Sequence, residues 1–403
     1  MSIKQKKGIS LIVLVITIIV MIILATAIIL TLNGSGIIGK AHEAKTASDL
    51  ANAKNVVAIA RAEWELNNIE IPFKEFAEGK LEEAGYKVGG NGGIIVSESG
   101  AINAIYIGSD DRQAIIPEGF TVSTLDTEDT VTEGLVVKDS KGNEFVWVPV
   151  DDFAKFERTT TYNGTITSPS TTYYTEPFSK TTVDQITLSL TNDLTGEWKE
   201  YAAMRASVQE NKGFYIGRYE AGTTKERTTA SNGTTDVVIQ KNKPVYTYVA
   251  WGPSMTDTIG EITCFGENEG VGAVELSRNL YKNSNSVVST LCYGVQWDAT
   301  LQFIYNTDED YITNSVNKGN YTGSLNETGY YEVNNIYDMA GNVWEWTMEA
   351  NSDQYRVVRG GYHSDDGEGF PASVRDVSFT PMLEEYSGSP IDLTGFRVTL
   401  YIK

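Results

Sequence analysis

The segment from Ile9 to Leu32 constrains the fold of this chain more than any other, because it is a long apolar run without a charged residue. As a helix it would be about 36 Å long, which is enough to cross a bilayer. It follows Lys4, Lys6 and Lys7. Basic residues beside a membrane helix stay on the cytoplasmic side, so the remaining chain is expected outside. A cleaved secretory signal has a shorter apolar core; Ala-Thr-Ala at 25–27 is like a cleavage site, yet the apolar run continues past it.

A second helical pattern begins beyond Asn33 and Gly34. Small and apolar side chains recur every three or four positions with polar residues between them, which is the period of an amphipathic helix. We expect this helix to continue outward from the membrane as a stalk. The residues of its apolar face are Ala47, Leu50, Ala53, Val57, Ala60 and Trp64.

The basic leader, Gly8, the apolar helix and the amphipathic continuation together resemble a type IV prepilin over residues 1–68. The resemblance implies cleavage between Gly8 and Ile9 by a prepilin peptidase, with other pilin-like subunits as possible partners. Pilins usually carry Glu at the fifth position of the mature chain, where it helps subunit assembly, and this chain has Val13 there. Polymerisation into a pilus is therefore left open, and a plain membrane anchor with a stalk is the alternative.

The rest of the sequence divides into a small unit and a large one. Residues 69–122 predict a small α+β spacer, with a helix in "FKEFAEGKLEEAGY" and a hairpin in "GGIIVSESGAINAIYIG". Residues 123–133 are polar and acidic, and we interpret them as a linker. In residues 134–403, aromatic and β-branched runs such as "FVWVPV", "GFYIGRYEAG" and "PVYTYVAW" alternate with turns, while "WKEYAAMRASV" and "YGVQWDATLQFIY" predict helices. The expected fold class is α+β.

Composition excludes several classes of function. A net charge of −21 and a pI near 4.6 argue against nucleic acid, because phosphate binding requires clustered Lys and Arg. Two His in the chain supply too few ligands for a His-based metal cluster. Cys264 and Cys292 permit one disulfide, and two buried thiols are equally compatible with the sequence.

Five motifs occur in order in the large unit: "FYIGRYEAG" at 214–222, "YGVQWDATLQF" at 293–303, "NNIYDMAGNVWEWT" at 334–347, "RVVRGG" at 356–361 and "GFRVTL" at 395–400. In this order they resemble the formylglycine-generating, sulfatase-modifying-factor family over residues 134–403. The resemblance implies a variant of the C-type lectin fold. That architecture serves formylglycine-generating oxidases, iron-dependent sulfur-transfer enzymes and pure binding proteins, so it leaves the function undecided.

The "DMAGNVWE" part of these motifs is a candidate metal site. Two carboxylates bracket a Gly-Asn turn, and carboxylate and carbonyl oxygens are the ligands that Ca²⁺ prefers. The resemblance implies a structural calcium ion held by the side chains of Asp338 and Glu345 and by the carbonyls of Gly341 and Val343. The alternative is a hydrogen-bonded turn without a metal.

Other motif residues have a structural interpretation. Trp344 and Trp346 occupy alternate positions of a predicted strand, and we expect them to pack in the core. Arg397 lies between two apolar residues, where an ion pair is expected rather than a catalytic cation.

The formylglycine-generating reaction requires two thiolates shortly after the "RGG" motif, because they hold the copper ion. Residues 362–376 contain no Cys, and the iron-dependent relatives need a His cluster that His42 and His363 do not supply. We therefore predict a non-catalytic binding protein, anchored in the membrane and displayed on the outer surface of a bacterial cell, with an unknown protein or glycan as ligand. A divergent oxidoreductase of the family and a structural pilus or envelope component are the alternatives.

The segment 362–379 follows "RGG", and we interpret it as the ligand-binding surface. It mixes rings, which give rigid contact area, with hydroxyl and carboxylate groups that hydrogen-bond adaptably, as antibody loops do. Each candidate residue type arises from an Asn codon changed at its first two bases, as in the lectin-type proteins that diversity-generating retroelements act on; Glu368 lies outside this codon set. Ordinary drift in a surface loop is the alternative. The candidates are Tyr362, His363, Ser364, Asp365, Asp366, Phe370, Val374, Asp376 and Phe379.

Overall fold

A computed structural model describes residues 37–89, 93–97, 100–107, 110, 112–125, 127–156, 161–162, 169–170, 197–228, 236–249, 251, 272–350, 356–378 and 393–403. The leader, the cleavage site at Gly8 and Ile9 and the apolar run at 9–32 lie outside these residues. Within the described ranges, no helix combines the length and the apolar character that a membrane span requires.

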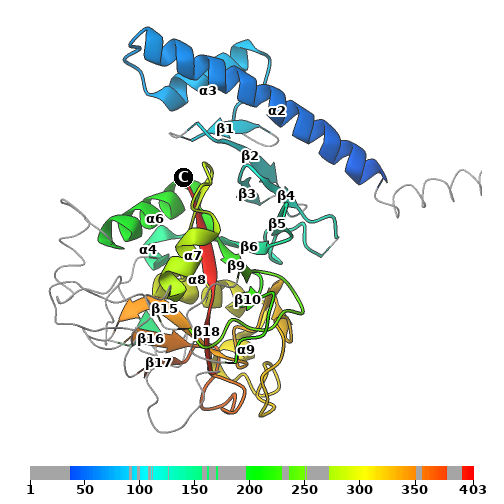
Figure 1. Ribbon diagram of the computed structural model, residues 1–403, viewed down its shortest axis with the longest axis vertical. Helices are drawn as coiled ribbons and strands as arrows, with labels where there is room; N and C mark the ends of the chain where they lie inside the picture. Colours follow the sequence, from blue (N-terminus) through cyan, green and yellow to red (C-terminus); the bar gives the residue numbers. More distant parts are fainter. Residues whose placement is uncertain are drawn as a thin grey trace, which may run out of the picture.

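The N-terminal unit contains two helices and a small antiparallel sheet with strand order β1-β2-β3 (Figure 1). Ala53, Val57 and Ala60 of α2 are buried in one cluster with apolar residues of α3, as their spacing predicts. The predicted helix and hairpin of the spacer are both confirmed. The elements are α2 (Ile37–Leu66), α3 (Phe73–Glu83), β1 (Ile94–Val96), β2 (Ile102–Ile107) and β3 (Gln113–Ile116).

The C-terminal unit is built on a six-stranded antiparallel sheet with strand order β12-β19-β9-β6-β5-β4. Helix α6 packs on β19 and β9, α7 packs on β12, and α8 packs on β6 (Figure 1). Both predicted helices are confirmed as α6 and α8. The elements are β4 (Phe120–Val122), β5 (Val136–Asp139), β6 (Glu144–Pro149), α4 (Phe153–Phe156), α6 (Glu197–Asn211), β9 (Gly213–Gly217), α7 (Ala273–Leu280), β12 (Val287–Leu291), α8 (Gly294–Tyr305) and β19 (Val398–Ile402).

A second sheet, with strand order β17-β16-β15-β18, carries most of the sequence motifs. Strand β18 runs parallel to β15, and the other two pairs are antiparallel. Trp344, Trp346 and Phe396 are buried in the main core, so the packing role predicted for the two Trp residues is confirmed. The elements are β15 (Trp344–Ala350), β16 (Arg356–Arg359), β17 (Arg375–Ser378) and β18 (Thr394–Phe396).

The remaining elements are a short helix and three two-stranded sheets among the described residues. Helix α9 follows α8, and the remaining strands form two-stranded pairs β7-β8, β10-β11 and β13-β14. Their bounds are β7 (Thr161–Tyr162), β8 (Pro169–Ser170), β10 (Gly222–Thr223), β11 (Val237–Val238), α9 (Glu309–Thr313), β13 (Glu332–Val333) and β14 (Ile336–Tyr337). The mixed helix and strand content expected from the sequence is confirmed.

The boundary between the two units differs from the predicted one. Strand β4 belongs to the large sheet, although residues 69–122 were assigned to the spacer. Strand β3 pairs with β2, yet its residues Ala114, Ile115 and Ile116 are buried in the main core. The hydrophobic pattern of these short strands gives their period but does not identify the core that they join.

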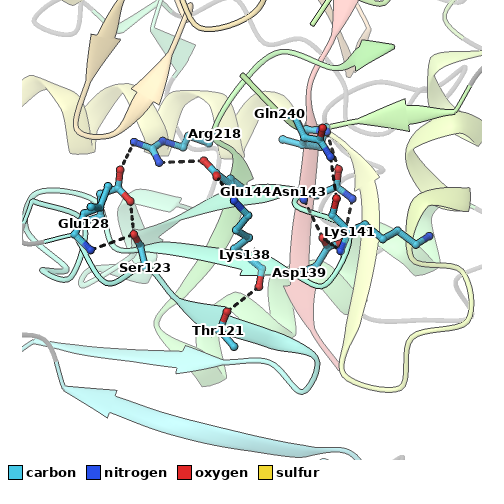
Figure 2. A network of polar contacts seen from close by, with 12 residues as sticks. Thr121, Ser123, Glu128, Lys138, Asp139, Lys141, Asn143, Glu144, Arg218 and Gln240 are labelled. Atoms are coloured by element: carbon cyan, nitrogen blue, oxygen red, sulfur yellow. Dashed lines mark hydrogen bonds and ion pairs between the residues drawn. The ribbon is translucent and has the colours of Figure 1, made fainter. Parts of the chain in front are cut away.

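The segment 123–133, predicted as a linker, is instead held against the large sheet. Glu128 is buried and pairs with Arg218, whose guanidinium also reaches Glu144 (Figure 2). Ser123 donates a hydrogen bond to the second oxygen of the Glu128 carboxylate. The acidic side chain of Glu128 therefore has partners inside the fold, which a composition typical of linkers does not exclude.

The run "PVYTYVAW" also departs from the prediction, because it forms an isolated bridge between Val245 and Gly222 instead of a strand. Tyr248 has a φ of 54°, in the left-handed region, which an extended strand cannot contain. The side chain of Arg227 donates hydrogen bonds to the carbonyls of Thr247 and Tyr248, which replaces strand pairing there.

Candidate functional site

The loop predicted to bind ligand begins where β16 ends, at Arg359. Gly360 and Gly361 follow with φ of 90° and 75°, a conformation that residues with a side chain rarely adopt. A Cβ on Gly361 would lie 2.8 Å from the carbonyl oxygen of Phe370, so both φ and space require glycine there. The carbonyl of Gly360 accepts a hydrogen bond from the N–H of Gly341 at 2.8 Å, which ties the turn to the "GNVWEW" motif.

Four buried charged side chains fix the other end of the loop. Arg375 pairs with Asp298 at 2.9 Å and with Glu349 at 2.7 Å. Arg359 pairs with Asp298 at 2.9 Å and lies 3.6 Å from Glu349. We call Asp298, Glu349, Arg359 and Arg375 the Arg359–Arg375 ring. Because α8, β15, β16 and β17 each contribute one residue, the ring joins the helix to three strands.

The Arg359–Arg375 ring also holds the loop backbone directly. Arg359 donates hydrogen bonds to the carbonyls of Val374 at 2.9 Å and Ser373 at 3.4 Å. Trp297 donates to the carbonyl of Ala372 at 3.1 Å. The chain between Gly361 and Ala372 is therefore a loop with both ends anchored in the core, and we call it the anchored loop.

The side chains of this loop differ in their exposure. Ser364, Asp366, Glu368 and Gly369 are exposed, and His363 is buried. Among the other predicted binding residues, Asp376 on β17 is exposed, while Phe379 lies outside the described residues. The remaining candidates are half-buried: Tyr362, Asp365, Phe370 and Val374.

Hydrogen bonds within the loop define its shape. Asp366 accepts bonds from the backbone N–H groups of Glu368 at 3.1 Å and Gly369 at 2.6 Å. Asp365 accepts a bond from the N–H of Tyr362 at 3.0 Å. Phe370 packs edge-on against Trp344, with ring centroids 5.8 Å apart. The structure thus brings the predicted residues from Tyr362 to Phe370 together on one anchored turn.

Asp365 is the titratable group of the loop with a clearly displaced pKa. Burial, with smaller contributions from the charges of Asp366 and Asp376, raises its pKa from 3.8 to about 6 against the opposing effect of the Tyr362 N–H. A like charge near a carboxyl group disfavours its ionised form.

The predicted calcium motif lies next to this loop, because its Gly341 is hydrogen-bonded to Gly360. The carboxylate of Asp338 is buried and accepts hydrogen bonds from the backbone N–H groups of Gly329, Tyr330 and Tyr331, at 2.6 to 3.1 Å. Asp338 has a φ of 57°, and Gly341 next along the motif has a φ of 73°. The motif therefore forms a tight, hydrogen-bonded turn.

Glu345 pairs with Arg397, whose guanidinium donates to both carboxylate oxygens at 2.5 to 3.2 Å. Arg397 also donates to the carbonyls of Gly217 and Tyr337, at 3.0 and 2.9 Å. Both side chains are buried, so the ion pair expected for Arg397 is confirmed.

Glu220 is a third buried carboxylate beside this pair. One of its oxygens accepts a hydrogen bond from Asn342 at 2.7 Å, and the other has no hydrogen-bond partner among the described residues. Burial raises the pKa of Glu220, and the charges of Asp338 and Glu345 raise it further. We call Glu220, Asp338, Glu345 and Arg397 the Arg397 cluster.

These contacts bear on the fit of a calcium ion. The oxygens of Asp338 and Glu345 already accept bonds from N–H donors, and a carboxylate has about four lone-pair sites in all. Among the described residues, no group of three or more His, Cys, Asp or Glu side chains is arranged to hold a metal ion. The carboxylates as placed do not fit calcium, and the assignment of Asp338, Gly341, Val343 and Glu345 as ligands stays a prediction.

Cys292 and His363 each contact the residue that follows them in the chain. Cys292 is buried, and its thiol donates to the carbonyl of Tyr293 at 3.4 Å, while Cys264 lies outside the described residues. The pairing of the two Cys residues is therefore still open. His363 Nδ1 lies 2.9 Å from the hydroxyl of Ser364.

Sequence reasoning missed Glu220, Asp298, Glu349 and Arg375 as partners in these networks. One signal was available on β15. Glu345 and Glu349 occupy alternate positions of a strand whose other face carries Trp344 and Trp346, so both faces of the strand are rich in groups that need burial or pairing. Two carboxylates on a buried strand face require cationic partners, although the sequence does not say which.

Comparison with known proteins agrees with part of the sequence interpretation. Residues 294–402 match the family model of the sulfatase-modifying factor enzyme 1-like domain, also called FGE-sulfatase. No curated protein matches the chain significantly.

Two solved structures are similar to the chain at low identity. PvdO from Pseudomonas aeruginosa is 13% identical, with 66% of this chain and 97% of that one covered and a TM-score of 0.29. Treponema denticola variable protein 1 is 11% identical, with 74% and 98% covered and a TM-score of 0.24. TM-scores this low do not establish a common architecture. The chain thus contains, at residues 294–402, a segment that matches the sulfatase-modifying factor family, and this segment includes the whole anchored loop.

Proposed function

We propose that this protein is a non-catalytic binding protein whose C-terminal unit contacts its ligand through the loop 362–376. The proposal rests on a contrast between two sets of residues. One set holds the ends of the loop, and we call it the frame; the other set is the side chains that the loop exposes, and we call it the filling. The frame consists of two glycines in the left-handed region and a buried ionic ring. The filling consists of exposed or half-exposed hydroxyl, carboxylate and aromatic side chains. Binding residues are commonly carried on loops that a rigid scaffold positions.

The proposal includes anchoring and display at the bacterial cell surface. The lysines and the apolar run at 9–32 support a membrane anchor, with cleavage by a prepilin peptidase between Gly8 and Ile9. Mass spectrometry of the membrane fraction tests this part of the proposal. A chain that begins at Ile9 is expected, whereas an intact Met1 or a chain cut after Ala27 contradicts the pilin-like interpretation.

The absence of Cys from residues 362–376 supports a binding role over oxidase activity, because the copper ion of the family's oxidases needs two thiolates there. The full chain, reconstituted with Cu(I) and given a Cys-containing sulfatase peptide, is expected to form no aldehyde. Formation of aldehyde would favour the divergent oxidoreductase.

We also propose that the loop is diversified in sequence. Its candidate residues share the Asn-codon relationship, and both ends of the loop are held by the two glycines and the Arg359–Arg375 ring, which are not candidate positions. Copies of the gene from sister strains are expected to differ at Tyr362, Ser364 and Asp366 while Arg359 and Arg397 stay fixed, with a reverse-transcriptase gene nearby. Differences spread evenly over 134–403 would leave a binder of fixed specificity.

A further inference from the structure

A second loop, residues 314–331, lies against the anchored loop and connects α9 to β13. The N–H of Ser315 donates to the carbonyl of Gly367, and the N–H of Gly323 donates to that of His363, both at 2.7 Å. The hydroxyl of Tyr321 donates to the carbonyl of Phe370 at 2.6 Å. Three hydrogen bonds along its length therefore join the second loop to the first.

The two loops are also in close van der Waals contact. A Cβ on Gly367 would lie 2.5 Å from the carbonyl carbon of Ser315 and 2.6 Å from the nitrogen of Val316. Glycine at 367 thus lets the backbones touch, and it places Val316 beside the exposed residues Asp366 and Glu368. The surfaces of the two loops are continuous at this point.

The second loop exposes apolar side chains although its backbone is fixed. Among the described residues, seven large hydrophobic side chains are exposed, and three of them lie in this loop: Val316 at 44%, Leu325 at 36% and Tyr330 at 49%. Ser315, Asn320 and Thr328, by contrast, are buried, and Asn320 bonds to the carbonyl of Ser324 and to Asn342. Apolar groups held outward by a fixed backbone are typical of protein interaction surfaces.

The exposed charges that the two loops themselves carry are acidic, although the exposed Lys241 lies against the second loop at Gly329. Lys318 is the one basic residue in 308–332, and it pairs with Asp308 at 2.6 Å. In 362–376 the basic side chain is Arg375, which is buried in the Arg359–Arg375 ring. The exposed carboxylates on the two segments are Glu309, Asp310, Glu327, Glu332, Asp366, Glu368 and Asp376.

We propose that the loop 314–331 and the exposed part of 362–376 form one docking face for a basic protein segment, with Val316 and Leu325 as its fixed apolar contacts. The proposal rests on the binding role proposed above. A basic partner follows from charge complementarity, since acidic groups attract it and disfavour acidic partners. A protein segment is favoured over a neutral glycan because exposed aliphatic side chains and carboxylates on the same two loops match an apolar side chain flanked by Lys or Arg. The second loop thus supplies constant contacts beside a loop that varies.

The test uses a random linear-peptide library displayed on phage and selected on the full chain in detergent. Peptides that pair Lys or Arg with apolar residues are expected to be enriched. The affinity of the most enriched peptide is then measured for two loop variants and two matched controls. The apolar variant Val316→Ser/Leu325→Ser is matched by Ile59→Ser/Leu66→Ser on α2, where both side chains are also exposed. The charge variant Glu327→Gln/Glu368→Gln is matched by Glu75→Gln/Glu82→Gln on α3, all four being exposed.

The apolar variant is expected to weaken binding about tenfold, a change typical of a contact at the centre of an interface. The charge variant is expected to slow association and to reduce the dependence of affinity on salt. Both controls should bind as the unchanged chain does. Enrichment of acidic peptides, enrichment of none, or equal losses in the controls would overturn the proposal.

One further variant separates this inference from the proposed function. If Ser364→Ala/Asp376→Ala weakens peptide binding and Val316→Ser/Leu325→Ser does not, the anchored loop binds ligand and the fixed contacts assigned to the second loop are wrong. If neither variant weakens binding, the proposed function fails as well.

Discussion

The Arg359–Arg375 ring and the Arg397 cluster are both buried charge networks, but they differ in their balance. The ring has two guanidinium groups and two carboxylates, so its formal charges cancel. The Arg397 cluster has one guanidinium group among the three carboxylates of Glu220, Asp338 and Glu345. A buried charge without compensation is costly, and buried acids usually respond by retaining a proton.

This difference separates two roles. The balanced ring lies at the end of the anchored loop, where it connects one helix to three strands. In the unbalanced cluster, burial raises the pKa of Glu220, Asp338 and Glu345, against the opposing charge of Arg397.

Replacing Arg397 with Met should have the largest effect. The change removes the cation of the Arg397 cluster and leaves Glu345 and the carbonyls of Gly217 and Tyr337 without their donors. Loss of one partner from a buried pair costs about 3–5 kcal/mol, and the upper end is expected here. Urea unfolding of the full chain, followed by near-ultraviolet circular dichroism, measures the loss. Lys318→Met, which removes a partly exposed pair, is the control and should cost under about 1 kcal/mol.

If Arg397→Met abolishes folding altogether, Arg397→Lys provides the quantitative comparison. Lysine keeps the charge but cannot donate to both carboxylate oxygens and two carbonyls at once. An intermediate loss is expected. A stability equal to that of the unchanged chain would show that the cluster does not depend on the guanidinium geometry.

Replacing Arg375 with Met should cost less, about 3 kcal/mol, because Arg359 continues to pair with Asp298. Adding Glu349→Leu should recover part of the loss, since the double change removes both charges of one pair. A double-mutant cycle of unfolding free energies measures the coupling. Additive losses would contradict the paired arrangement of the ring.

The sequence predicted the helices and core residues of this chain better than it predicted which charged side chains pair with one another. The helix at Phe73–Glu83, α8 and the two core Trp residues follow from periodicity, which is a local property. The partners of Glu128 and Asp298 are far away in sequence, at Arg218 and Arg375, so no local pattern could reveal them. For the same reason, composition alone suggested a linker where Glu128 is in fact buried.

For the candidate site, the motifs predicted where the binding loop begins but not what holds its far end. "RGG" indicates a glycine turn, and both glycines have the positive φ that such a turn requires. The sequence of the second loop, 314–331, contains no motif that predicts a binding role. Its contact with Gly367 arises from the packing of backbones, which leaves no signal in one sequence beyond the glycine itself.

The pH dependence of stability should show a smaller effect, from Asp365 in the anchored loop. Its pKa of about 6 in the folded chain lies above the usual value of 3.8, so the folded state holds the proton more tightly than the unfolded state. The contribution of Asp365 to stability is therefore greatest below about pH 4 and is lost as pH rises through about 6. Unfolding free energies of the unchanged chain and of Asp365→Asn, compared across this range, isolate that contribution. A difference between the two that does not vary with pH would contradict it.

Chelation of calcium should have the smallest effect, and it tests the charge balance of the Arg397 cluster directly. The family resemblance predicts a calcium ion on Asp338 and Glu345, whereas the structure surrounds both carboxylates with N–H donors. If protons and donors compensate the cluster, EDTA leaves the unfolding midpoint of the full chain unchanged, which is the outcome we expect. If calcium is bound and the free ion is present at a hundredfold its Kd, chelation lowers the free energy of unfolding by about 2.7 kcal/mol. Addition of excess CaCl2 must then restore the midpoint, and Glu345→Gln must lose the response. Such a result would mean that the donors now on Asp338 make way for the metal, and that both buried networks are balanced, one by side chains alone and the other by an ion.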